Sequence, residues 1–146
     1  LKSFTMKNRV FTLLLLALMT ACGGRGSSSA ASPQEQPDGV EELSFHTKKR
    51  CPTCRAIEQL TREVVEQEFA DEVADGTLRL RVAEITEDEE LAARYEVAWS
   101  SLLLSHRHNG EEQVVDLTRF AFAHARTDAD LFRRELKARI EQLLAR

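Results

Sequence analysis

The residues of this chain best suited to chemistry are two cysteines separated by two residues, in the run Cys51-Pro52-Thr53-Cys54. A pair at this spacing can close a short disulfide or bind a soft metal ion, and the thiolate is its reactive form. Four basic residues surround the pair, and no acidic residue lies between positions 47 and 57; the four are Lys48, Lys49, Arg50 and Arg55. Because cations stabilise a thiolate, this pattern favours thiol–disulfide exchange.

The position of the pair along the chain assigns a role to each cysteine. A short strand is expected to end near His46, and a helix is expected to begin at Pro52, which suits the first helical position because it has no N–H group to leave unpaired. Cys51 would then lie at the positive end of the helix, where its pKa falls. We therefore expect Cys51 to be the nucleophile and Cys54, one turn later, to be the resolving thiol, with Arg50, Pro52 and Thr53 lining the site.

Two other uses of the same cysteines compete with exchange. Cys and His ligands suit copper(I) or zinc, so Cys51 and Cys54 could bind a metal with His46, or with His106 and His108 if these converge. The pair could also be a purely structural disulfide, although so short a loop gains little stability from closure. No cofactor is expected, because the sequence has no Gly-x-Gly-x-x-Gly fingerprint for a flavin or nicotinamide.

The first 22 residues have the order of an export signal. Lys2, Lys7 and Arg9 precede an apolar run, 10–19, which is followed by small residues and Cys22. The run is about half of the roughly 20 residues that a membrane-spanning helix needs. Translation is expected to start at Met6.

The end of this segment resembles the lipobox of bacterial lipoproteins. The resemblance is carried by Met19-Thr20-Ala21-Cys22, and it implies that Cys22 is acylated and becomes the new N-terminus. Gly23, rather than Asp, follows the cysteine, and in this respect the sequence is similar to lipoproteins that are transported to the outer membrane. The expected location is therefore the bacterial cell envelope, with the protein held by lipid and facing the periplasm.

Composition divides the remaining chain into a linker and one domain. Residues 23–39 contain no large apolar side chain and are expected to form a flexible linker. Residues 40–146 are long enough for one small domain. They carry 16 Lys and Arg against 22 Asp and Glu, a net charge of −6, which argues against nucleic acid as a partner.

Hydrophobic periodicity predicts the order βαβαββα in this domain. Strands are expected around 43–46, 78–82, 102–104 and 114–117, the last two joined by a hairpin at Asn109-Gly110. Helices are expected from the cysteines to Asp75-Gly76, after a Thr86/Glu89 capping box, and over 128–146.

This order, with a Cys-x-x-Cys pair between the first strand and first helix, resembles the thioredoxin fold. The implied architecture is three-layer α/β/α around a mixed four-stranded sheet. Within that superfamily the sequence resembles a group of short exported bacterial proteins, the nitrophenyl compound nitroreductase subunit ArsF family. The motifs that carry this resemblance are the Cys-x-x-Cys pair, Trp99-Ser100-Ser101-Leu102-Leu103, Asp116-Leu117-Thr118, Phe122 and Ala125-Arg126-Thr127.

Several residues depart from the thioredoxin pattern. Ser100 and Ser101 stand where thioredoxins carry a cis-proline, so we expect a trans or rearranged loop here. Both serines are expected to line the site, with a substrate groove that differs from that of thioredoxins. Arg50 replaces the usual tryptophan, and no buried acid is expected in the first strand. Trp99 either anchors the core or walls the site. The implied function is a membrane-anchored oxidoreductase, more a reductase or redox carrier than an oxidase, with protein thiols or disulfides of the envelope as partners.

Overall fold

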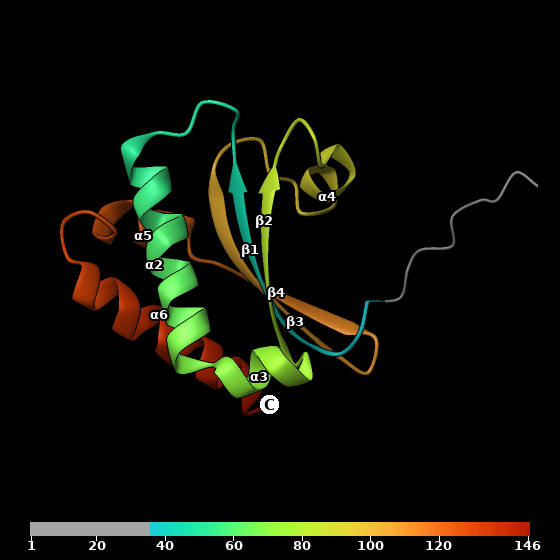
Figure 1. The fold of residues 1–146 in the computed structure, drawn as a ribbon. Coiled ribbons are helices and arrows are strands. Elements are labelled where there is room, and N and C mark those ends of the chain that lie inside the picture. The colour runs from blue at the N-terminus through green and yellow to red at the C-terminus, as the bar shows by residue number, and fades with distance from the viewer. Residues whose placement is uncertain (1–35) are drawn as a thin grey trace, which may run out of the picture. The chain divides into compact units, whose positions relative to one another are not determined.

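The computed structural model describes residues 36–146 (Figure 1). The expected signal, the lipid-attachment residue Cys22 and all but the last residues of the expected linker lie outside this range. Among residues 36–146, no helix is both long enough and apolar enough to cross a membrane.

A mixed four-stranded sheet forms the centre of the domain. The strands are β1 (Gly39–His46), β2 (Leu78–Glu84), β3 (Ser101–His108) and β4 (Glu111–Asp116), in the order β2-β1-β3-β4. β2 runs parallel to β1, whereas β3 is antiparallel to both β1 and β4. A parallel βαβ unit followed by an antiparallel hairpin and a helix, in this strand order, is the thioredoxin-like fold, which confirms the predicted fold class.

Helices cover both faces of the sheet (Figure 1). α2 (Pro52–Glu68), α5 (Thr118–His124) and α6 (Ala129–Leu144) pack on one face, and α4 (Glu89–Arg94) packs on the other. β1 is buried on both faces, because Val40 belongs to the larger core under α2 and α6 while Leu43 and Phe45 belong to the smaller core under α4. The strand that leads to the cysteines is thus anchored in both cores.

The hairpin between β3 and β4 has the predicted turn. Asn109 and Gly110 both have positive φ, 51° and 81°, which is the requirement of a type I′ turn.

The helix that follows the cysteines is shorter than predicted. It ends at Glu68, and a separate short helix, α3 (Ala70–Asp75), follows. Phe69 between them leaves helical geometry, with φ −131° and ψ 33°, and its ring is buried in the larger core. Burial of this ring outweighs the continuity of the helical pattern in the sequence.

Two other local predictions are corrected. Thr86 does not cap a helix: its hydroxyl lies 2.7 Å from the carboxylate of Glu84, and α4 begins later, with Asp88 at its N-cap position. The sequence pattern also missed α5, a helix of seven residues whose Phe120 packs on Phe132 of α6 with ring centroids 6.0 Å apart.

An acidic side chain ties α4 and the segment after it to the hairpin. Glu112 on β4 accepts hydrogen bonds from Arg94 (2.9 Å), Tyr95 (2.7 Å) and Ser105 (2.5 Å), and Arg107 lies 3.0 Å away. Partial burial pushes the pKa of Glu112 upward, but these hydrogen bonds prevail and lower it to about 2. This cluster fixes the start of the 95–100 segment, which leads to Ser100 beside Cys54.

Contrary to the prediction from the sequence, the first strand does contain a buried acid. Glu42 is fully buried, lies between Leu80 and Leu104 in the sheet, and faces the larger core. Neither of its carboxylate oxygens has a hydrogen-bond partner among the described residues. Burial raises the pKa of Glu42 well above its usual value, and the positive charge of Arg62 offsets only part of this. The sequence does not predict this burial, because two adjacent glutamates, Glu41 and Glu42, are typical of a solvent-exposed segment.

We predict that Glu42→Gln stabilises the domain at neutral pH. Folding raises the pKa of Glu42, so the domain loses no stability to this group below about pH 4.5, where the carboxyl is protonated in both states. As the pH rises from there toward the folded-state pKa, the unfolded chain ionises first and the free energy of unfolding falls. Gln removes that loss, so the free energy of unfolding at pH 7, measured by urea titration, should rise by about 1–3 kcal/mol and depend less on pH. Glu66→Gln, at an exposed position, is the control. Destabilisation by Glu42→Gln at pH 7 would show that the carboxylate is ionised and paired.

Candidate functional site

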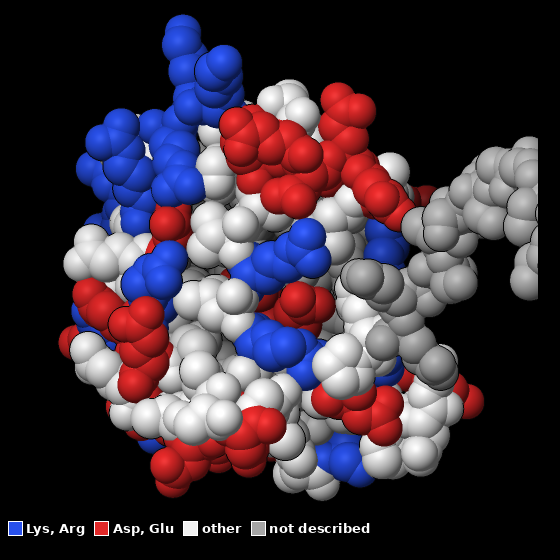
Figure 2. All heavy atoms as spheres, turned by 45° about the vertical axis from the view of Figure 1, so that its right-hand side comes forward, with Lys and Arg blue, Asp and Glu red and all other residues white. Residues whose placement is uncertain are grey.

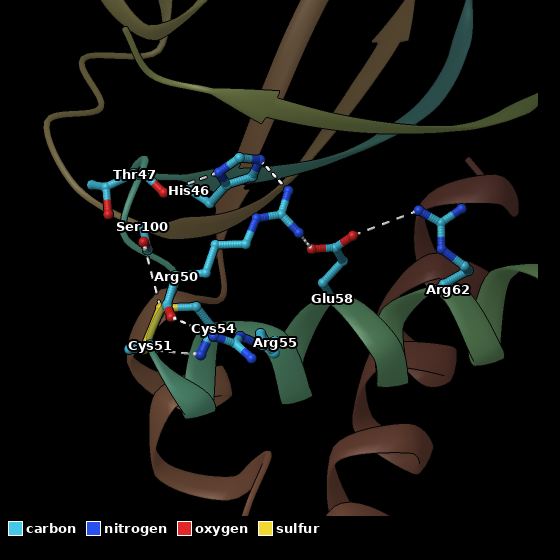
Figure 3. Close-up of polar contacts among 9 residues, drawn as sticks. All are labelled: His46, Thr47, Arg50, Cys51, Cys54, Arg55, Glu58, Arg62 and Ser100. Atoms are coloured by element: carbon cyan, nitrogen blue, oxygen red, sulfur yellow. Dashed lines mark hydrogen bonds and ion pairs between the residues drawn. A yellow bond between two sulfur atoms is a disulfide. The ribbon is translucent and has the colours of Figure 1, made fainter.

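Cys51 and Cys54 form a disulfide at the junction of β1 and α2 (Figure 3). Their Cα atoms are 5.1 Å apart, within the usual range for a disulfide. Cys51 is the N-cap residue of α2, with extended backbone angles of −74° and 161°, and Pro52 is the first helical residue as predicted. The strand, the short loop 47–50 and the helix therefore place both cysteines at one edge of the sheet.

The sulfur of Cys51 occupies the position of a helix-capping oxygen. It accepts a hydrogen bond from the backbone N–H of Cys54 at 3.0 Å. A capping acceptor satisfies one of the N–H groups that a helix leaves unpaired at its start, and α2 continues for 17 residues behind it. In the reduced protein this geometry would stabilise a negative charge on Cys51.

The segment before β3 approaches the other sulfur. The hydroxyl oxygen of Ser100 lies 3.6 Å from the sulfur of Cys54, and the hydroxyl of Ser101 donates to the carbonyl of Trp99 at 2.9 Å. No cis peptide bond occurs in residues 36–146, which confirms the expectation of a trans loop at Ser100 and Ser101. A serine hydroxyl thus stands beside the cysteine expected to act as the resolving thiol.

Trp99 does not anchor the core. Its side chain is 68% exposed, and it is the only tryptophan of the chain. Trp99 directly precedes Ser100, so it extends into solvent from the loop that touches the disulfide. Pro52 is exposed as well, whereas Thr53 is half-buried. A role for these side chains in lining the site stays a prediction.

The basic residues around the cysteines differ in their surroundings. Lys48, Lys49 and Arg55 are exposed, and Arg55 reaches the backbone carbonyl of Arg50 at 3.5 Å. Arg50 instead donates to the carboxylate of Glu58 and to the ring of His46, away from the sulfurs (Figure 3). On the face shown in Figure 2, Lys and Arg side chains gather in a patch next to a patch of Asp and Glu.

The geometry does not favour the metal-binding alternative. His46 is occupied on both nitrogens, by Arg50 at Nε2 and by the carbonyl of Thr47 at Nδ1, 3.2 Å away. Within residues 36–146 no three His, Cys, Asp or Glu side chains are grouped to hold a metal ion. His106 is five residues from Ser101 along β3, about 17 Å at roughly 3.3 Å per residue, so it and His108 lie toward the opposite end of the sheet from the disulfide.

No protein-family model and no curated protein matches this sequence. Among solved structures the chain is similar to a malarial protein (18% identity, 73% of this chain and 99% of that chain, TM-score 0.45). It is also similar to the Trx4 domain of ERdj5 (12%, 69% and 82%, TM-score 0.44) and to a thioredoxin from Thermus thermophilus (18%, 70% and 75%, TM-score 0.42). The fold assignment therefore rests on the strand order and connectivity described above.

The capping geometry predicts that the two thiols react unequally. When the reduced Cys22→Ser chain is treated with one equivalent of iodoacetamide at about pH 6, well below the ordinary thiol pKa of about 8.5, Cys51 should carry most of the label because only ionised thiol reacts. Peptide mapping by mass spectrometry measures the distribution. Equal labelling of Cys51 and Cys54, or preference for Cys54, would contradict the assignment.

Proposed function

We propose that the domain is a thiol–disulfide oxidoreductase or redox carrier, with Cys51 as the nucleophile and Cys54 as the resolving thiol. The observation that carries this proposal is the hydrogen bond from the Cys54 amide to the Cys51 sulfur at the start of α2. It favours ionisation of one particular thiol, at a helix terminus next to an exposed loop, and a structural disulfide has no need of such placement.

The exchange proceeds in two steps. The Cys51 thiolate attacks one sulfur of a protein disulfide, forming a mixed disulfide and releasing the other sulfur as a thiolate. Cys54 then loses its proton and attacks the Cys51 sulfur, which closes the Cys51–Cys54 disulfide and releases the second thiolate. The partner gains two electrons and its two sulfurs take up two protons, while the dithiol of this chain loses the same number. Run in reverse, the same steps oxidise the partner.

The direction in a cell follows from the relative potentials of this pair and its partner. Stabilising the Cys51 thiolate stabilises the reduced form and makes the disulfide a stronger oxidant. Against this, Arg50 is paired with Glu58, so a carboxylate offsets the charge of one of the four local cations. We therefore favour a reductase or carrier that receives electrons from a dedicated membrane partner. The sequence favours the same direction.

Trapping tests the proposal directly. In the full-length chain expressed with its export signal, Cys54→Ser should accumulate mixed disulfides with envelope proteins, because the intermediate on Cys51 can no longer be resolved. Non-reducing electrophoresis with mass spectrometry identifies them. Two matched controls retain Cys22: the single variant Cys51→Ser and the double variant Cys51→Ser, Cys54→Ser. Mixed disulfides of equal amount in the controls, or none in Cys54→Ser, would remove the oxidoreductase proposal.

We further propose that the domain is held at the bacterial cell envelope by lipid on Cys22. The support is the order of charged, apolar and small residues before Cys22, similar to a lipobox. A spacer without large apolar residues then separates the lipid from the domain, and two or more acyl chains suffice for stable anchoring. The finer resemblance to the ArsF family agrees with export, and it adds no nitroreductase chemistry because the sequence has no flavin or nicotinamide fingerprint.

Cys22→Ser should abolish acylation of the chain. Cells supplied with a labelled fatty acid should label the wild-type protein and Cys51→Ser equally, and both should sediment with membranes. Cys22→Ser should carry no label and remain with its uncleaved signal or in the soluble fraction. Label retained in Cys22→Ser would show that lipid is attached elsewhere or that another feature anchors the chain.

A further inference from the structure

The side chain of Arg50 connects the two elements on either side of the disulfide. Its guanidinium donates to Nε2 of His46, the last residue of β1, and to the carboxylate of Glu58, in the second turn of α2 (Figure 3). The side chains of Arg50 and Glu58 are 34% and 23% exposed, so this contact is partly shielded from water. We call the contact among Arg50, His46 and Glu58 the arginine bridge.

Both acceptors of the bridge are themselves held in place. Nδ1 of His46 lies 3.2 Å from the carbonyl oxygen of Thr47, and a carbonyl can only accept, so Nδ1 carries the hydrogen and Nε2 presents its lone pair to Arg50. The second carboxylate oxygen of Glu58 lies 3.8 Å from the guanidinium of Arg62, one turn further along α2. The guanidinium of Arg50 therefore has two acceptors with fixed orientations. Both acceptors lie on the side of Arg50 that points away from the sulfurs (Figure 3).

The bridge matters because Arg50 directly precedes Cys51. A cation within about 4–6 Å of an acid lowers its pKa by about 1–3 units when the pair is shielded from water, and by less when it is exposed. Freed from its acceptors, the flexible Arg50 side chain could turn toward the sulfur of the next residue. In the bridge its charge is instead offset by a carboxylate.

We propose that Glu58, assisted by His46, is a positioning residue that holds Arg50 away from Cys51 and so keeps the Cys51 thiolate less stable, and the disulfide less oxidising, than the basic local sequence would make it. This inference rests on the proposed function, since it concerns the tuning of the same dithiol. It also reverses the expectation from the sequence that Arg50 stabilises the thiolate.

Glu58→Gln tests the proposal in the reduced full-length chain. In a Cys22→Ser, Cys54→Ser background only Cys51 titrates, and the absorbance of the thiolate near 240 nm reports its pKa. Glu58→Gln should lower that pKa by about 0.5–1 unit, because the freed guanidinium can approach the sulfur from a partly exposed position. With Cys54 restored, the glutathione equilibrium should shift toward the dithiol by about 3- to 10-fold, since one pKa unit corresponds to a factor of ten.

A double-mutant cycle separates positioning from the direct charge of Glu58. In an Arg50→Met background Glu58→Gln should leave the Cys51 pKa unchanged, because no guanidinium remains to be freed. Arg50→Met alone should also change that pKa little, which tests the proposal even if Glu58→Gln fails to fold. Glu66→Gln is the matched control, since Glu66 lies on the same helix 3.5 Å from Arg62 without touching Arg50.

Three outcomes would overturn the inference: an unchanged pKa in Glu58→Gln, an equal fall in the Arg50→Met background, or a rise of about one unit in Arg50→Met alone, as expected for a cation that already acts on the sulfur. These titrations need no redox partner. Their failure is therefore distinguishable from failure of the proposed function, which the absence of trapped mixed disulfides would show.

Discussion

The hydrogen bond from the Cys54 amide to the Cys51 sulfur is the contact on which the candidate site depends. This hydrogen bond forms because Cys51 is the N-cap residue of α2. Pro52, the first residue of the helix, has no N–H group of its own. The strand before it fixes the other end of the loop, since β1 is paired on both edges and buried on both faces. The fold thereby directs the positive end of α2 at one sulfur of the pair.

Placement of α2 depends in turn on a core that is not uniformly apolar. Ile57, Leu60 and Val64 pack α2 onto the sheet, yet Glu42 lies in the same core with no hydrogen-bond partner among the described residues. A buried acid of this kind costs stability as long as the unfolded chain can ionise it. Around the cysteines the polar contacts are satisfied instead, with Arg50 between His46 and Glu58. Polar side chains at the end of β1 are therefore paired with one another, whereas the larger core contains an acid without a hydrogen-bond partner among the described residues.

Sequence patterns predicted those parts of the fold that depend on local periodicity. Alternation at Leu78, Leu80 and Val82, the Asn109-Gly110 turn and the proline after Cys51 each act through backbone geometry that is visible in the sequence. Tertiary contacts decided the rest: Phe69 breaks a helix to bury its ring, Glu42 is buried beside a charged neighbour, and Trp99 is left in solvent. The pairing of Cys51 with Cys54 could be predicted because the spacing of the two cysteines is local. The direction of Arg50 was missed because Glu58, its partner, is eight residues away.

We propose that the fold itself lowers the pKa of the Cys51 thiol. The most direct test compares the pKa of the Cys51 thiol in the folded chain with its pKa in the same chain unfolded in urea, with Cys51 as the single titrating thiol. We expect a folded-state pKa clearly below the unfolded-state pKa, which should lie near the ordinary thiol value of about 8.5. Equal values in the two states, or a higher value in the folded chain, would contradict it.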